Sequence, residues 1–226
     1  MERREHRSRH VITDKFYFDA IKALVCELNY NEIPYVVVGG TAYQIKLASL
    51  LGGKDPITSI SGLESVLRPT GDIDLAVQSD ASEMTRIFNE MAMTSSFQIE
   101  NRTHNSAALR LGSNSLSINY ETSPEELRII SSHYGRIIDT SEEIYLAHSG
   151  KSVASVSIPK PEYLLITKLL MARVKDFTDI SNLLNVMRAK GKKVDFEEVL
   201  SILKSVNKEN KFEPIKEIAW DFYRGS

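Results

Sequence analysis

The sequence predicts an α+β fold: a mixed sheet with flanking helices over residues 11–158, followed by a C-terminal α-helical bundle over residues 159–226. In the first part, short β-branched or alternating apolar runs are separated by longer segments with helical periodicity. After Pro159-Lys160-Pro161 the apolar residues recur only at helical spacing, so we place a domain boundary there. The 226 residues, 42% of them hydrophobic, suffice for a sizeable core.

The first half reads as alternating elements in chain order. A helix is expected over residues 14–31, a buried strand over Tyr35–Val38 and a helix over residues 41–51. The small and polar stretch 52–66 suggests an insertion. Residues 72–78 alternate as a strand and 82–93 as a helix, and further strands are expected over 97–102, 107–111, 116–121, 143–147 and 153–158.

The remaining helices follow from capping signals and from the C-terminal periodicity. Ser123-Pro124-Glu125-Glu126 forms a helix start, because serine caps, proline suits the first turn and the acids complement the dipole. The C-terminal helices are expected over residues 161–172, 176–190, 196–206 and 214–223.

Composition excludes several classes of protein. The formal charge of −2 provides no global field for nucleic acid or lipid. The single cysteine, Cys26, excludes an internal disulfide and is expected in the core of the first helix. No apolar run approaches the roughly 20 residues of a membrane span, and no signal peptide is visible, so we expect a cytoplasmic protein without membrane contact. Residues 1–10, rich in arginine, are expected to form a flexible tail.

Two aspartates begin the strand at residue 72. Because side chains alternate along a strand, Asp72 and Asp74 point to one face and Ile73 to the other. Two neighbouring carboxylates repel unless a cation neutralises them, and Mg²⁺ shared with substrate phosphates suits such oxygen ligands. An isolated pattern of this kind usually just faces water, so this observation alone is weak.

A glycine pair lies where the preceding strand opens into a helix. Gly39-Gly40-Thr41 would present the free N–H groups and the positive dipole end of that helix to phosphate. The pair is also weak alone, but the two elements together provide for a triphosphate and its metal ion.

Three segments in order carry a resemblance to a known family: VVVGGTAYQIKLA, RPTGDIDLAV and ITKLLMARVKDFTDISNLL. Together they resemble the AbiEii-type nucleotidyltransferase-like proteins, toxins of bacterial abortive-infection and toxin-antitoxin systems within the polymerase-β nucleotidyltransferase superfamily. The resemblance implies a polymerase-β-type fold, a Mg²⁺ or Mn²⁺ cofactor and transfer of a nucleoside monophosphate from a triphosphate to an acceptor.

The resemblance also assigns roles by position. It implies nucleotide binding by Gly39, Gly40, Thr41, Arg68, Thr70 and Lys175, and catalytic roles for Asp72, Asp74, Lys168, Asp176 and Asp179. Physically, the Thr41 hydroxyl could donate to the phosphate tail, Arg68 could pair with a phosphate or brace Asp72, and Lys168 would add positive charge. Lys168 could equally extend to solvent from its apolar helix, and the spacing of Lys175, Asp176 and Asp179 also fits ordinary surface ion pairs.

The third metal-binding acid of the superfamily departs from the pattern. The polar face of the strand over 116–121 carries Ser117, Asn119 and Glu121, so a neutral amide is expected where an acid would stand. Glu121 could substitute as a metal ligand one pleat further along. If it does not, the chain is a nucleotide-binding or interaction protein that retains the fold without turnover.

The acceptor and partners are not legible from the residues. RNA such as the end of a tRNA is our first hypothesis, from the basic residues of the tail and of 188–193. A protein hydroxyl or a small molecule such as an antibiotic remains open, and the resemblance adds an antitoxin protein as partner. A third alternative is that the helical half mediates assembly and the matches are accidental.

Overall fold

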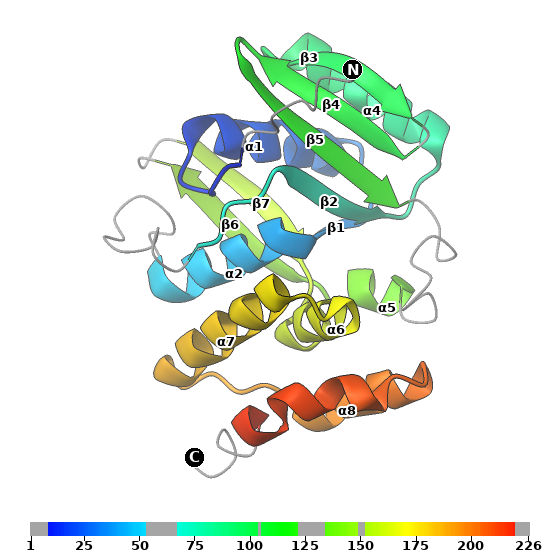
Figure 1. Ribbon diagram of the computed structural model, residues 1–226. Coiled ribbons are helices and arrows are strands. Elements are labelled where there is room, and N and C mark those ends of the chain that lie inside the picture. The colour runs from blue at the N-terminus through cyan, green and yellow to red at the C-terminus, as the bar shows by residue number, and fades with distance from the viewer. Residues whose placement is uncertain (1–8, 53–66, 104, 122–133, 149–151, 220–226) are drawn as a thin grey trace, which may run out of the picture.

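The computed structural model describes residues 9–52, 67–103, 105–121, 134–148 and 152–219, and confirms the α+β architecture (Figure 1). The insertion expected over 52–66 and the helix expected after Ser123 lie almost entirely outside these residues. No helix among the described residues is long and apolar enough to cross a membrane.

A mixed five-stranded sheet forms the centre of the molecule. Its strands are β1 (Tyr35–Val38), β2 (Asp72–Val77), β3 (Gln98–Thr103), β4 (Ser106–Leu111) and β5 (Asn114–Glu121). The order is β1-β2-β5-β4-β3, with β2 parallel to β5 and all other neighbours antiparallel. The parallel pairing of β2 with β5 brings residues that are far apart in the sequence side by side, including Asp74 and Asn119.

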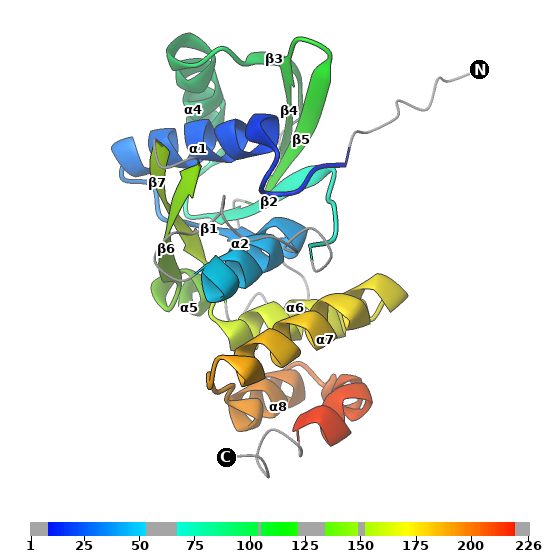
Figure 2. The same cartoon turned by 90° about the vertical axis from the view of Figure 1, so that its left-hand side faces the viewer.

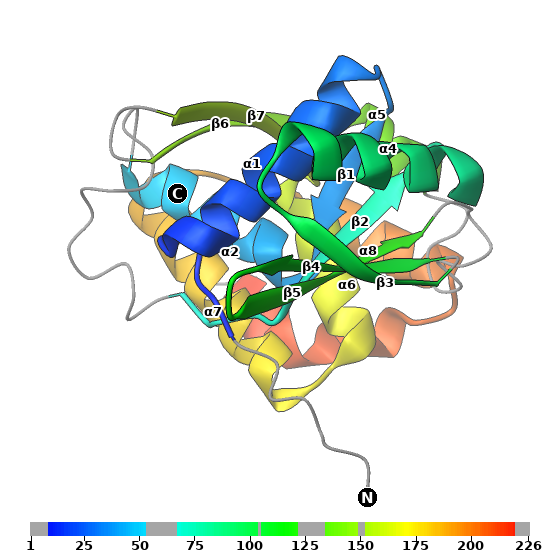
Figure 3. The same ribbon diagram turned by 90° about the horizontal axis from the view of Figure 1, so that it is seen from above.

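Helices from the first part of the chain lie around this sheet. They are α1 (Lys15–Tyr30), α2 (Gly39–Gly52), α4 (Ala81–Thr94) and the short α5 (Tyr134–Asp139). The helix α2 packs on β2 and β1, whereas α1 lies beside α4 (Figure 3). A hairpin of β6 (Glu142–His148) and β7 (Ser152–Ile158) packs on α1 and β1.

The C-terminal helices stack below α2. They are α6 (Pro161–Met171), α7 (Val174–Ala189) and α8 (Phe196–Ser205), and α2 lies between the sheet and α6 and α7 in both side views (Figure 2). The two halves share one continuous apolar core. The helix expected over 214–223 is found over its described residues 216–219, preceded by a 3₁₀ helix, Glu209–Ile215, that contains Pro214. The remainder of that range lies outside the described residues.

Two expectations for the N-terminal part need correction. Cys26 is exposed, because the buried stripe of α1 runs through Leu24, Val25 and Leu28 and leaves residue 26 on the outer side. His10, the last residue of the expected tail, is 8% exposed, and its backbone forms an antiparallel bridge with Thr70. Residue 10 is therefore part of the packed structure and not of a flexible tail.

Candidate functional site

The glycine pair lies directly against the second aspartate. Val38 of β1 pairs with Asp74 of β2, and the chain then turns into α2 at Gly39, whose φ is +65°. A β-carbon at Gly39 would lie 2.4 Å from Asp74 Oδ2. Only glycine allows both the left-handed backbone and this close approach. The first turn of α2, with its free N–H groups, therefore lies beside the Asp74 carboxylate.

Asp72 and Asp74 occupy the same face of β2, as expected. Both are half-buried and line one pocket, while Ile73 between them is fully buried. Asp72 Oδ1 accepts a hydrogen bond from Thr70 Oγ1 at 2.8 Å, which fixes that carboxylate. Burial, reinforced by the charge of Asp72, raises the pKa of Asp74 to about 6. The pair is therefore electrostatically costly while no cation neutralises it.

The neighbouring strand places an amide beside this pair. Asn119 of β5 is opposite Asp74, and its Nδ2 donates to Asp74 Oδ1 at 2.9 Å. Glu121 lies opposite Ala76, one pleat further along, and lines the same pocket. The position where the motif resemblance implies a third acid is thus held by a neutral hydrogen-bond donor, and the nearest carboxylate on β5 stands one pleat beyond it.

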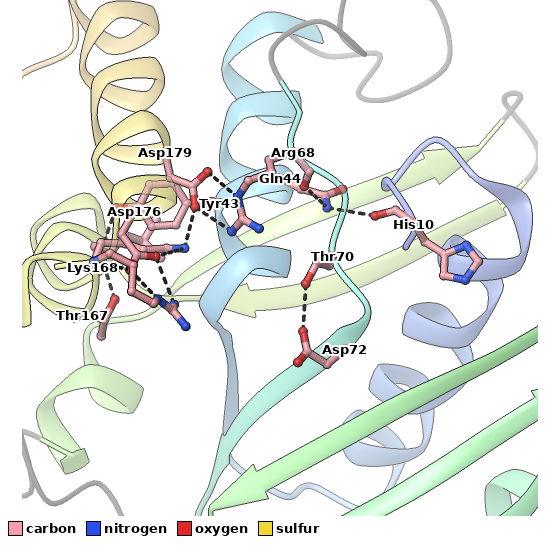
Figure 4. Close-up of polar contacts among 12 residues, drawn as sticks. His10, Tyr43, Gln44, Arg68, Thr70, Asp72, Thr167, Lys168, Asp176 and Asp179 are labelled. Carbon is pink, nitrogen blue, oxygen red and sulfur yellow. Dashed lines mark hydrogen bonds and ion pairs between the residues drawn. The ribbon is translucent and has the colours of Figure 1, made fainter. Parts of the chain in front are cut away.

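A chain of ion pairs links the sheet side of the pocket to the C-terminal helices (Figure 4). Arg68 donates from Nε and Nη2 to the two oxygens of Asp179, at 3.1 and 2.8 Å. Lys168 Nζ lies 2.6 Å from Asp179 Oδ2 and 3.3 Å from Asp176 Oδ1. Arg173 completes the chain with Nε 2.7 Å from Asp176 Oδ2. These acids therefore bind three cations rather than facing water.

Lys168 is buried, so the alternative that it extends to solvent is wrong. It is 4% exposed, and its ammonium lies 4.9 Å from the centre of the Tyr43 ring, a cation–π contact. Asp176 is fully buried; burial alone would raise its pKa, but hydrogen bonds from Arg173 and the charge of Lys168 hold that pKa below its ordinary value. The lowered pKa keeps Asp176 a carboxylate, which holds Lys168 and Arg173 in place.

Asp176 and Asp179 do not reach the pocket surface, whereas the cations that they bind do. Arg68, Lys168, Arg173 and Lys175 all line the pocket. Lys175 is exposed, and no ion pair is found for it within the described ranges. Burial and then the charges of Arg173 and Arg68 lower its pKa. Arg173 was not among the residues expected from the sequence, although it stands two residues before Lys175.

Thr41 does not fit its expected role. It is 1% exposed, and its hydroxyl lies 2.5 Å from Tyr17 Oη and donates to the Asp72 carbonyl at 3.1 Å. This placement contradicts the expectation that the hydroxyl binds phosphate, because the hydroxyl is already hydrogen-bonded to Tyr17 of α1. The Thr41 side chain instead fastens the start of α2 to the start of β2.

The segment before β2 is held by a residue that the sequence did not single out. Gln44 of α2 is 2% exposed; its Nε2 donates to the carbonyls of Arg68, at 3.0 Å, and His10, at 3.3 Å, while its Oε1 accepts from Ile12 N. Arg68 and Thr70 thereby acquire a fixed position relative to α2. The sequence does contain a signal for this role, because Gln44 is a polar residue among the apolar residues of α2.

The pocket that these residues enclose has a volume of about 560 Å³. Of the residues expected at the site, it is lined by Gly39, Gly40, Arg68, Thr70, Asp72, Asp74, Glu121, Lys168 and Lys175. One wall is acidic, one is cationic, and an apolar part is formed by residues such as Ile137, Tyr163 and Met171. Such a division suits a ligand with an anionic tail and an apolar ring.

No protein-family model matches the chain, and no curated protein matches its sequence. The chain is similar to several solved structures, among them two of ANT(2″)-Ia and one of the Megavirus polyadenylate synthase. A crystal structure of ANT(2″)-Ia with adenylyl-2″-tobramycin has a TM-score of 0.48 at 11% identity, covering 87% of this chain and 99% of that one. A solution structure of the antibiotic-resistance factor ANT(2″)-Ia has a TM-score of 0.45 at 11% identity, covering 94% and 100%. The Megavirus polyadenylate synthase has 0.43 at 14% identity, covering 80% and 33%.

Proposed function

We propose that this chain is a metal-dependent nucleotidyltransferase of the polymerase-β type, which binds a nucleoside triphosphate with Mg²⁺ and transfers its nucleoside monophosphate. The apposition of Gly39 and Asp74 carries the proposal. It puts a helix N-terminus, which favours phosphate, against a carboxylate pair, which favours a divalent cation. A triphosphate with its cation satisfies both at once.

The residues present fit a divalent cation. Asp72 and Asp74 supply hard oxygen ligands on one face, and burial, followed by the charge of Asp72, raises the pKa of Asp74. Mg²⁺ is commonly held by one or two carboxylates together with substrate phosphates. When bound here, it would neutralise phosphate oxygens and polarise the phosphorus that is attacked.

The other residues position the triphosphate. The first turn of α2 at Gly39 and Gly40 offers N–H groups to the phosphates, and Arg68, Lys168 and Lys175 offer positive charge from the opposite wall. An acceptor hydroxyl attacks the α-phosphorus, the bond to the β-phosphate oxygen breaks, and pyrophosphate leaves. Glu121 is the remaining carboxylate of the pocket that can take the proton of the hydroxyl.

The RNA acceptor rests on the basic residues of the tail and of 188–193, and the biological role rests on the motif resemblance. We propose an RNA acceptor such as a tRNA end, with a protein hydroxyl as the next candidate, and the role of a toxin controlled by an antitoxin protein. We also propose that residues 11–158 form the nucleotidyltransferase-like domain and residues 159–226 a helical domain, even though α2 packs closely on α6 and α7.

The test is transfer of label. We expect Mg²⁺, each α-labelled triphosphate and total RNA to yield labelled RNA with the unaltered chain. Asp72→Ala and Asp74→Ala should abolish transfer, whereas Asp19→Ala, which removes a partly exposed carboxylate on α1, should not. Parallel reactions with total protein or aminoglycosides identify the other acceptor classes.

One observation favours a second function. Asn119 binds Asp74 where the superfamily pattern expects an acid, which would leave nucleotide binding without turnover. Triphosphate binding that depends on Asp72 and Asp74, with no transfer to any acceptor, would establish this alternative.

A further inference from the structure

The carboxylate pair offers fewer metal-binding oxygens than two cations require. One oxygen of each aspartate already accepts a hydrogen bond, Asp72 Oδ1 from Thr70 and Asp74 Oδ1 from Asn119. One other oxygen of each aspartate is left, Asp72 Oδ2 and Asp74 Oδ2; both residues line the pocket, and Asp74 Oδ2 lies beside Gly39. Across the described part of the chain, no cluster of three or more acidic, histidine or cysteine side chains is arranged to hold a metal. Two oxygens and the substrate phosphates suit one Mg²⁺.

The position where a second cation would need an anion holds a donor instead. The Asn119 amide directs its N–H toward Asp74, and a donor hydrogen repels a cation placed between the two residues. Glu121 lies two residues further along β5, about 7 Å away at the usual rise per residue. It is therefore too far along the strand to replace Asn119 directly between the aspartates.

Fixed positive charge is present on the facing wall. Arg68, Lys168, Arg173 and Lys175 line the pocket, and the two acids that bind three of them leave this group with a net charge of two positive units. That equals the charge of one divalent cation.

We propose that the site takes a single divalent cation with its triphosphate, and that the Arg68, Lys168, Arg173 and Lys175 group replaces the second cation. This inference rests on the proposed function, and it concerns how this chain differs from a site built on three acids. The triphosphate is then neutralised by the two positive charges of the bound cation and by the net two positive charges of the side-chain group.

The experiment counts Mn²⁺ bound to the protein with a saturating non-hydrolysable triphosphate, by equilibrium dialysis and by electron paramagnetic resonance. We expect one Mn²⁺ per chain. Asn119→Asp should bind two, with the second at least tenfold tighter than in the unaltered chain and with spectral broadening from two neighbouring Mn²⁺ ions. Asn114→Asp, the same substitution at the exposed start of β5, should still bind one.

The possible failures are distinct. Two Mn²⁺ ions in the unaltered chain would overturn the single-cation inference and leave the proposed function standing. No Mn²⁺ at all would overturn both. One ion in both the unaltered chain and Asn119→Asp would overturn the inference that Asn119 keeps the second cation out. If Asn119→Asp does not fold, Asn119→Glu supplies the carboxylate on a longer side chain, and the count in the unaltered chain still decides the first point.

Discussion

Gly39 and Asp74 approach so closely that a β-carbon on residue 39 would lie 2.4 Å from Asp74 Oδ2. The contact joins the bend before α2 to the strand that carries both aspartates. It therefore makes residue 39 a sensitive test of whether the bend and the carboxylates act together.

Gly39→Ala should weaken binding of Mn²⁺ with a non-hydrolysable triphosphate at least tenfold, measured by calorimetry. The methyl group must displace the Asp74 carboxylate, and the positive φ adds strain. Gly112→Ala is the matched control, because its φ is +61° and a β-carbon there would meet no other atom within 4 Å. It should cost about 1 kcal/mol of stability and leave binding unchanged. Equal loss of binding in both variants would detach Gly39 from the site.

Asp74→Asn should stabilise the metal-free protein near pH 7.5. Because the folded state raises the pKa of Asp74 from 3.8 to about 6, folding takes up protons between these values, so the contribution of Asp74 to stability declines as pH rises from about 4 to 6. The asparagine removes this penalty, which is about 1 to 3 kcal/mol for a half-buried group. Urea unfolding should show the gain at pH 7.5 and its disappearance near pH 4. A variant less stable than the unaltered chain at pH 7.5 contradicts the proposed strain.

Much of the local structure could be predicted because it is decided by neighbouring residues. The apolar run Tyr35–Val38, with three β-branched valines, became β1, and the alternation from Asp72 placed both aspartates on one face of β2. The glycine pair marked the bend because a left-handed backbone requires glycine locally.

The rest depended on pairing between distant segments. The contact of Asn119 with Asp74 follows from the parallel register of β5 on β2, which periodicity cannot supply. The Thr41 hydroxyl was misassigned because its partner Tyr17 comes from another helix. Lys168 could be buried only because Asp176 and Asp179 on α7 compensate its charge, a fact of packing between helices.

Thr41→Val tests the corrected role of that residue. The variant loses hydrogen bonds with Tyr17 and with the Asp72 carbonyl, so we expect about 1 to 2 kcal/mol of destabilisation in urea unfolding. Affinity for Mn²⁺ with triphosphate should change less than threefold. Tyr17→Phe removes the other partner and should behave alike. A tenfold loss of affinity in Thr41→Val alone would restore a phosphate contact to its hydroxyl.

Lys168 and Lys175 should separate stability from binding, because one is buried in the ion-pair network and the other is exposed. Lys168→Met leaves Asp176 and Asp179 with less compensating charge inside the protein, and should cost about 2 to 4 kcal/mol of stability. Lys175→Met should change stability by less than about 0.5 kcal/mol, since an exposed side chain that forms no ion pair with the described residues contributes little.

The Lys175→Met variant also tests whether this exposed lysine contributes to triphosphate binding. Lys175→Met should weaken triphosphate binding roughly five- to thirtyfold, because its ammonium lines the pocket and a charge-assisted contact is worth about 1 to 2 kcal/mol. The difference in triphosphate affinity between Lys175→Met and the unaltered chain should become smaller as salt rises from 50 to 300 mM, since an exposed charge is screened. If Lys175→Met binds triphosphate as tightly as the unaltered chain at low salt, the cationic wall of the pocket does not hold the phosphates.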